Sequence, residues 1–169
     1  MKDKRPDPRP RANALLWQAY LHWDQLMQVR KASLLRVSSI EHGKCKYDAE
    51  FEQNFIAAID PLLKDARDTM INYGIMCGPV WTWLTSIKGL GAGGLAAQLL
   101  AQIDYPAPFP GSHPEHCETI SKLWRFAGWA VTDGEIDRCQ KGEKSPYNRK
   151  LKAVCWNIVD SFIKQQTPV

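Results

Sequence analysis

The sequence predicts an all-α protein, in which a long antiparallel pair of helices is followed by a compact domain built on a helical hairpin. Apolar residues recur every three or four positions over two long stretches, and a short polar turn separates those stretches. Further along, a glycine-containing turn joins two shorter apolar segments. The apolar fraction of 44% is sufficient to build a core in a chain of 169 residues. We divide the chain into residues 1–12, 13–78 and 79–169.

The first part, residues 1–12, is expected to be a flexible basic arm. Residues 1–11 contain three prolines and five basic residues. Such a composition favours an extended, mobile chain over a packed element.

Residues 13–78 are expected to form the helical pair. The first helical stripe follows Asn13, ends before Gly43 and carries the apolar positions Leu16, Tyr20, Trp23, Met27, Leu34 and Val37. The second stripe runs through Phe51, Phe55, Ile59, Leu62, Ala66, Met70 and Tyr73. Pro61 is expected to kink or restart this second helix, because proline lacks the backbone donor of an interior helical position.

Stripes of this kind are typical of a plain core or of a coiled coil. If the pair is too long to be covered by the small C-terminal part, its remaining apolar surface must be covered by a second chain. We therefore expect a homo-oligomer, either a dimer or a larger assembly.

Residues 84–103, LTSIKGLGAGGLAAQLLAQI, predict two short helices joined by a glycine-rich turn. Gly89 and Gly91 allow backbone conformations that other residues resist, and their missing side chains let a phosphodiester approach the main chain. Apolar residues before and after the turn share one seam: Leu84, Ile87, Leu95, Leu99 and Ile103. This is the helix-hairpin-helix pattern, in which free N–H groups at the start of the second helix favour an anion.

We therefore predict a site for a nucleic-acid backbone at this turn. Its residues are Lys88, Gly89, Leu90, Gly91 and Gly93. The alternative is an ordinary turn between two packed core helices. No nucleotide cofactor is expected: the glycines also fit a G-x-G-x-x-G string, but that motif must follow a β-strand, and no strand-like segment precedes it.

A second predicted contact with phosphate lies near the C-terminus. Between residues 138 and 152 there are six basic residues and one acidic residue, Glu143. The six are Arg138, Lys141, Lys144, Arg149, Lys150 and Lys152. Their clustering suits a loop and helix start that follow a phosphate backbone, whereas the alternative is a solvated basic loop. The net charge of +4 alone is too modest to decide.

Two helices are expected in the last third of the chain. One begins near Ser121 and ends at Gly128. The other covers residues 149–164 and carries a broad apolar face formed by Leu151, Val154, Cys155, Ile158, Val159 and Phe162.

The proline-rich segment between the hairpin and these helices is expected to lack regular structure. Its His113, His116 and Cys117 suggest zinc, but their spacing matches no usual ligand set, and Cys139 would have to be brought in by folding. We therefore expect no metal site. Five widely spaced cysteines favour reduced thiols, and no apolar run is long enough for a membrane span or a signal peptide.

Three segments, in the order in which they occur along the chain, resemble a known family. They are SIKGLGAGGLAAQLLAQID, TISKLWRFAGW and KGEKSPYNRKLKAVCWNIVDSF. They are similar to the C-terminal transposase domain of insertion-sequence transposases that carry an N-terminal RuvC-like DEDD nuclease domain. The helical pair resembles the coiled-coil segment that links those two parts, so the resemblance covers about residues 13–165. It implies DNA recombination, assembly as multimers and, in some members, direction by a structured RNA.

The resemblance does not extend to a complete catalytic centre. We expect no RuvC-like domain before Asn13, and with it the acidic metal-binding cluster is missing. In the family, a serine ahead of the glycine of the AGW-like segment acts as the nucleophile towards DNA. Counted back from Gly128, that position holds Thr119, and the nearest serine is Ser121. Both are candidate nucleophiles, although helix capping is the simpler role for Thr119.

The sequence leads to two functional hypotheses of different class. The first is a DNA-binding, transposase-derived protein without catalysis of its own, located in the cytoplasm with the nucleoid. The second is a recombinase or transposase subunit that a separate RuvC-like partner completes. We expect the first, with DNA or a structured RNA as partner, no cofactor and no membrane contact. A helical assembly protein that binds no nucleic acid is the remaining alternative.

Overall fold

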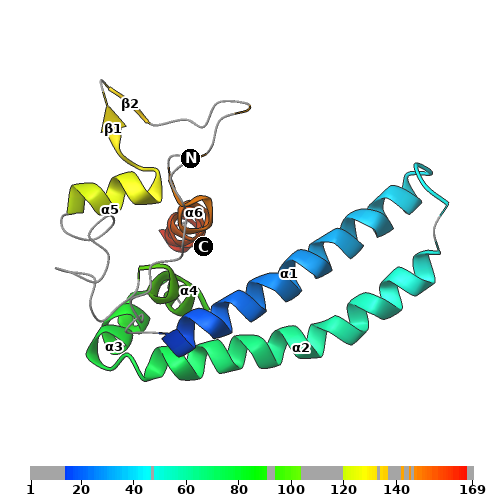
Figure 1. Cartoon of the computed structure of the whole chain (residues 1–169), viewed down its shortest axis with the longest axis horizontal. Helices are drawn as coiled ribbons and strands as arrows, with labels where there is room; N and C mark the ends of the chain where they lie inside the picture. Colours follow the sequence, from blue (N-terminus) through cyan, green and yellow to red (C-terminus); the bar gives the residue numbers. More distant parts are fainter. Residues whose placement is uncertain are drawn as a thin grey trace, which may run out of the picture.

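The computed structural model describes residues 14–46, 48–90, 94–103, 120–132, 134–136, 142, 145 and 147–166. Six helices and one short two-stranded hairpin lie in these ranges, which confirms the all-α fold class (Figure 1). The predicted basic arm, the proline-rich segment and the zinc ligands considered above lie outside the described residues. No helix in the described ranges is both long enough and apolar enough to cross a membrane.

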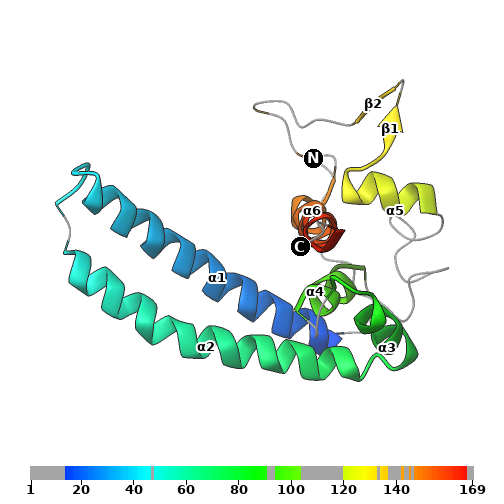
Figure 2. The ribbon, with the colours of Figure 1, turned by 180° about the vertical axis from the view of Figure 1, so that it is seen from behind.

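Helices α1, Ala14–Glu41, and α2, Ala49–Ile75, form the predicted antiparallel pair. Figures 1 and 2 show it projecting away from the smaller helices. The helix α1 ends before Gly43, as expected, and Gly43 turns the chain with a φ of 66°. Asp48 then caps α2, because its carboxylate accepts hydrogen bonds from the backbone N–H groups of Glu50 and Phe51.

Pro61 does not restart the second helix. It lies inside α2, which continues to Ile75 and curves gently in Figure 1. Pro61 and Ala57 both lie on an exposed face. Water can therefore satisfy the Ala57 carbonyl group that loses its helical partner, and the helix tolerates the proline.

The base of the helical pair shares one core with the hairpin. The hairpin consists of α3, Pro79–Ser86, and α4, Gly94–Ile103. The helix α4 packs against α1, α2 and α6, and Ala96 and Ala97 on it are fully buried, which allows close helix packing. The buried residues of this core are Leu16, Ala19, Tyr20, Met70, Leu84, Leu90, Ala96, Ala97, Leu100 and Ala101.

The outer half of the pair packs through a different face from the one that the sequence predicts. The sequence predicts inward-facing side chains at four positions that are exposed in the structure, with exposed fractions of 41%, 65%, 38% and 54%: Leu34, Phe51, Phe55 and Leu62. The buried positions there include Ser33 and Glu52. The prediction followed apolar character alone, and it is wrong at these four residues because polar side chains occupy the seam.

The polar seam is held together by Arg36. Its Nε lies 2.5 Å from Oε1 of Glu52, and its Nη2 donates to Oγ of Ser33 at 2.9 Å. The hydrogen bond from Arg36 holds the pKa of the Glu52 carboxyl below its ordinary value. A buried polar layer of this kind specifies the register of paired helices, and here it leaves an apolar face uncovered on the outside.

The C-terminal part adds α5, Ile120–Ala127, a hairpin of β1, Val131–Thr132, and β2, Glu135–Ile136, and then α6, Arg149–Gln166. The helix α5 ends at Gly128 as predicted, with a φ of 74°. Val131 pairs with Ile136 in the antiparallel hairpin. The helix α6 packs against both α4 and α5 and so ties this part to the common core (Figure 2).

Candidate nucleic-acid interface

The turn between α3 and α4 carries the predicted hairpin site. Lys88 is exposed, whereas the Leu90 side chain is only 4% exposed and belongs to the core. The Leu90 N–H group donates to the Ile87 carbonyl oxygen at 3.1 Å, so the turn itself uses that donor. Gly91 and Gly93 lie outside the described residues.

Gly89 is required by packing against α6. Its φ is 107°, a conformation that L side chains rarely adopt. A Cβ atom there would lie 2.5 Å from Cδ1 of Phe162. The Gly89 carbonyl oxygen also accepts a hydrogen bond of 2.6 Å from Oγ of Ser161. One side of this glycine is therefore filled by α6, and a phosphate can approach only elsewhere on the turn.

A pocket of about 760 Å³ opens beside the first turn of α4. Its walls come from α1, α2, the hairpin turn and the first half of α4, and its charged residues are Lys64, Arg67 and Asp68 on α2. The guanidinium group of Arg67 lies against α4: Nη2 is 3.1 Å from the position that a Cβ atom on Gly94 would occupy.

The electrostatics at this point favour an anion. A helix N-terminus carries partial positive charge, so the Arg67 cation meets a charge of the same sign. The first turn of α4 contains no acidic side chain to offset it. A phosphate placed there would interact favourably with Arg67, with Lys64 and with the helix end, and these contacts outnumber the repulsion from Asp68.

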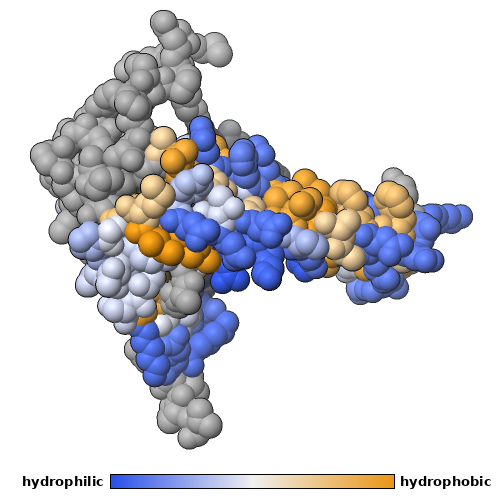
Figure 3. Space-filling view, turned by 90° about the horizontal axis from the view of Figure 1, so that it is seen from below, coloured by the Kyte–Doolittle hydropathy of each residue, from blue (hydrophilic) through white to orange (hydrophobic). Residues whose placement is uncertain are grey.

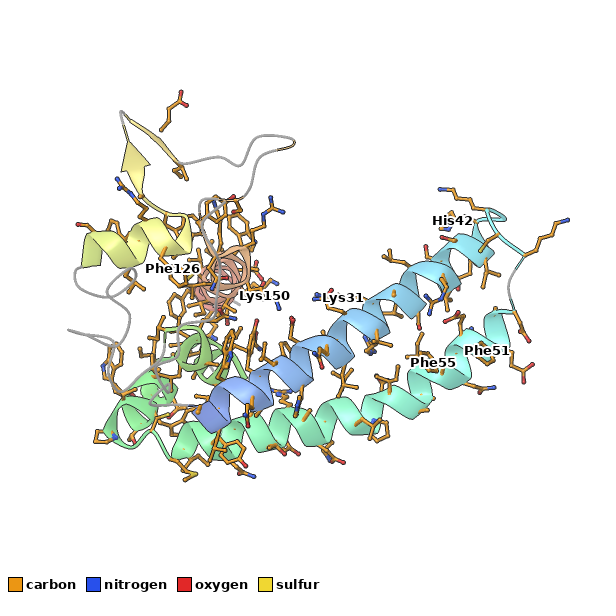
Figure 4. All side chains as sticks on the ribbon, viewed as in Figure 1. Lys31, His42, Phe51, Phe55, Phe126 and Lys150 are labelled. Atoms are coloured by element: carbon orange, nitrogen blue, oxygen red, sulfur yellow. The ribbon has the colours of Figure 1, made fainter. Side chains whose placement is uncertain are left out.

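The basic residues at the start of α6 have separate partners. Lys150 makes an ion pair with Asp24 on α1, with 2.5 Å between Nζ and Oδ2. Figure 4 places Lys150 on α6, beside α1. Lys152 lies 4.4 Å from the ring centre of Tyr147, and Arg149 is exposed at the first position of the helix. The other predicted residues, Arg138, Lys141 and Lys144, lie outside the described residues.

Asn148 links this segment to the core. Its Oδ1 atom accepts hydrogen bonds from the N–H groups of Lys150 and Leu151, so it caps α6. Its Nδ2 atom donates to Oε1 of Gln102 on α4 at 2.8 Å. Burial, followed by the nearby Asp24, raises the pKa of Tyr20 on α1 to about 12. The start of α6 is thus fixed against both α4 and α1.

Of the two candidate nucleophiles, the structure describes only Ser121. It is exposed in the first turn of α5 and lines a pocket of about 380 Å³ with Trp124, Arg125 and Val131. Arg125 follows Ser121 by one helical turn, where a cation could accompany a phosphate that reaches the serine. Thr119 lies outside the described residues.

The thiols in the described ranges are free, and burial raises the pKa of Cys77 and Cys155, so both are protonated at neutral pH. Within those same ranges, no group of three or more His, Cys, Asp or Glu side chains is placed to hold a metal ion.

Sequence reasoning missed Lys64 and Arg67. In the sequence they are ordinary charged residues on a solvated helix face. Lys64 follows the buried Leu63, and Arg67 lies three residues before the buried Met70. These neighbours are the only signal in the sequence that the two residues border the core. Their proximity to α4 depends on tertiary packing, which the periodicity of α2 does not contain.

Comparisons of this chain with known protein families, with curated proteins and with solved structures find no match.

Proposed function

We propose that this chain is a transposase-derived, nucleic-acid-binding protein that holds the phosphate backbone at the start of α4 and does not perform catalysis alone. The observation that carries the proposal is the position of Arg67, whose guanidinium group faces the N-terminal end of α4 without an acidic residue in the first turn. Such an arrangement favours an anion at the helix end.

Two exposed cations extend this surface. Lys88 lies on the turn that precedes α4, and Arg149 lies at the first position of α6, which packs on α4. Contacts of this kind fix the position of a nucleic-acid backbone without reading its bases. The partner we propose is DNA, or a structured RNA that offers a similar backbone, in a cytoplasmic, nucleoid-associated setting.

A salt titration tests this function. We expect the protein to bind a labelled duplex, a four-way junction or a structured RNA with an affinity that falls steeply as salt rises, because each neutralised phosphate releases counterions. The nucleic acid that binds with the highest affinity identifies the partner. Failure of the folded protein to bind any of them at low salt would contradict the proposal and favour the helical assembly function.

We further propose that copies assemble through the exposed apolar face of α2 in the helical pair. Phe51 and Phe55 project from α2, with ring centres 6.4 Å apart and planes within 5° of parallel (Figure 4). Leu62 continues this apolar face along α2. Figure 3 shows hydrophobic side chains along the pair on the side that it presents. Because α1 packs on the neighbouring face of α2 through Ile59 and Leu63, the occupant we propose for this exposed apolar face is the same face of a second copy.

The variant with Phe51→Glu and Phe55→Glu is expected to weaken this assembly by roughly a hundredfold or more, because burying unpaired carboxylates in an apolar interface is costly. Light scattering at micromolar concentration should show an oligomer for the unaltered chain and a monomer for the variant. Gln53→Glu, which adds charge at another exposed position of the same helix turn, should leave the oligomer intact. A monomeric unaltered chain would contradict the proposed assembly.

The second candidate function is a recombinase subunit completed by a separate RuvC-like partner. The observation that favours it is Ser121, exposed in a pocket that also contains Arg125. Attack by the Ser121 hydroxyl would join Oγ to phosphorus and release a DNA hydroxyl group, leaving a covalent adduct. A protein–DNA band that survives denaturation, and that Ser121→Ala abolishes, would support this function over simple binding.

A further inference from the structure

A second pocket, of about 400 Å³, lies beside the start of α6. It contains three aromatic side chains and two cations. The residues used in the argument are Trp129, Tyr147, Arg149, Lys152, Trp156 and Asn157. Its volume falls in the range of small-ligand sites rather than of macromolecular grooves.

The walls of this pocket are fixed before any ligand arrives. The Tyr147 ring packs directly on Gly128, where an added Cβ atom would lie 2.7 Å from the ring. The N–H group of Asn148 donates to the Phe126 carbonyl oxygen at 2.7 Å, and Ser145 Oγ donates to the Tyr147 carbonyl oxygen at 2.9 Å. These contacts hold the tyrosine against the end of α5, so the pocket is preorganised.

Lys152 brings a positive charge over the aromatic walls. Its Nζ atom lies 4.4 Å from the ring centre of Tyr147 and 5.4 Å from that of Trp129. Within the described part of the chain, its partners are these rings, and no carboxylate pairs with it. Cation–π contacts satisfy a lysine only in part, so Lys152 keeps its attraction for an anion.

Trp156 supplies a largely exposed aromatic surface. It follows Lys152 by one turn of α6, and 63% of it is exposed. The indole Nε1 atom of Trp129, by contrast, is buried and has no acceptor among the described residues. Asn157 adds an amide, which can both donate and accept hydrogen bonds.

We propose that this pocket binds one unpaired nucleotide of the nucleic acid, with its base stacked on Trp156 and its phosphate beside Lys152. Every base has a face that stacks on an aromatic ring, and a cation next to that ring suits the phosphate that accompanies the base. A paired base cannot enter, because its faces are covered by its neighbours in the duplex. The inference rests on the proposed function and adds to it a preference for a bulge, a junction or a single-stranded end.

The test compares two duplexes that differ by one nucleotide. In one, a fluorescent adenine analogue forms a single-nucleotide bulge, and in the other the same analogue is paired. We expect the unaltered protein to bind the bulged duplex more tightly and to quench the analogue only in the bulge. Parallel experiments with DNA and with RNA show which of them supplies the nucleotide.

Trp156→Ala is expected to abolish the preference for the bulge, a loss of roughly tenfold or more in affinity for the bulged duplex, while binding of the paired duplex is unchanged. Trp156→Phe should keep most of the preference, because phenylalanine still stacks. The matched control is Trp83→Ala, which removes a tryptophan of similar exposure, 62%, from α3 and should keep the preference. Trp156 is mainly exposed, so its replacement leaves the fold intact, and thermal unfolding verifies this.

The outcomes separate the two proposals. If both duplexes bind equally and Trp156→Ala changes neither, the nucleotide pocket is overturned while backbone binding stands. If the folded protein binds neither duplex at low salt, both proposals are overturned. Quenching in the bulge that disappears with Trp156→Ala and persists with Trp83→Ala supports the pocket.

Discussion

Replacing Gly89 by alanine is expected to destabilise the protein by about 2–5 kcal/mol. The glycine has a φ of 107°, which an L side chain adopts only with strain, and the new Cβ atom would lie 2.5 Å from Cδ1 of Phe162. To relieve the contact, the phenylalanine must leave its position or α6 must move away from the turn. Urea unfolding followed by circular dichroism measures the loss.

Gly43→Ala is the matched control. Gly43 also has a positive φ, 66°, but nothing lies within 4 Å of an added Cβ atom. Gly43→Ala should therefore lower the free energy of unfolding only by the cost of the backbone strain, about 1 kcal/mol. If Gly89→Ala lowers the free energy of unfolding by no more than Gly43→Ala does, then α6 does not pack closely on the turn. In a Phe162→Ala background, the cost of Gly89→Ala should fall towards that of the control.

Gly89 is a poor position at which to test nucleic-acid binding by mutation. The sequence predicts Gly89 as a phosphate contact, and its replacement would be the natural test of binding. Because α6 fills one side of the residue, loss of nucleic-acid binding in Gly89→Ala would first report a displaced helix. Side chains on the rim, such as Lys88 and Arg67, offer cleaner tests.

Local signals were enough to predict most of the fold. The positive-φ glycines Gly43 and Gly128 mark helix ends that can be read directly from the chain, and the seam of the hairpin follows from apolar spacing. Each of these features depends on residues close together in the sequence.

The failures involve contacts between distant residues. Leu62 and Leu63 are adjacent apolar residues, and nothing local decides which of them faces α1; Leu63 does, with 8% exposed. The ion pair between Arg36 and Glu52 joins two helices and determines which face becomes the seam. Similarly, Arg67 belongs to the candidate site only because α2 packs beside α4, which composition and spacing cannot reveal.

Replacing Arg67 by glutamate is expected to reduce affinity for nucleic acid by roughly tenfold to a hundredfold. The variant removes one phosphate contact and places a negative charge in its position. The dependence of log affinity on log salt should also become less steep, by about 1. Filter binding or fluorescence anisotropy over a range of salt concentrations measures both quantities.

The same substitution is not expected to weaken the fold, and this separates a binding role from a structural one. A carboxylate at the N-terminal end of α4 interacts favourably with the helix dipole, so the free energy of unfolding should stay the same or rise by about 0.3–1 kcal/mol. Lys44→Glu makes the same change in net charge at the exposed turn between α1 and α2, far from α4 in Figure 1, and should leave affinity nearly unchanged. Equal losses in the two variants would mean that overall charge, and not the site at α4, governs binding. The phosphate is located at the start of α4 if Arg67→Glu is stable but binds nucleic acid poorly while Lys44→Glu binds it well. The reason is that the helix dipole attracts both the phosphate and the carboxylate that displaces it.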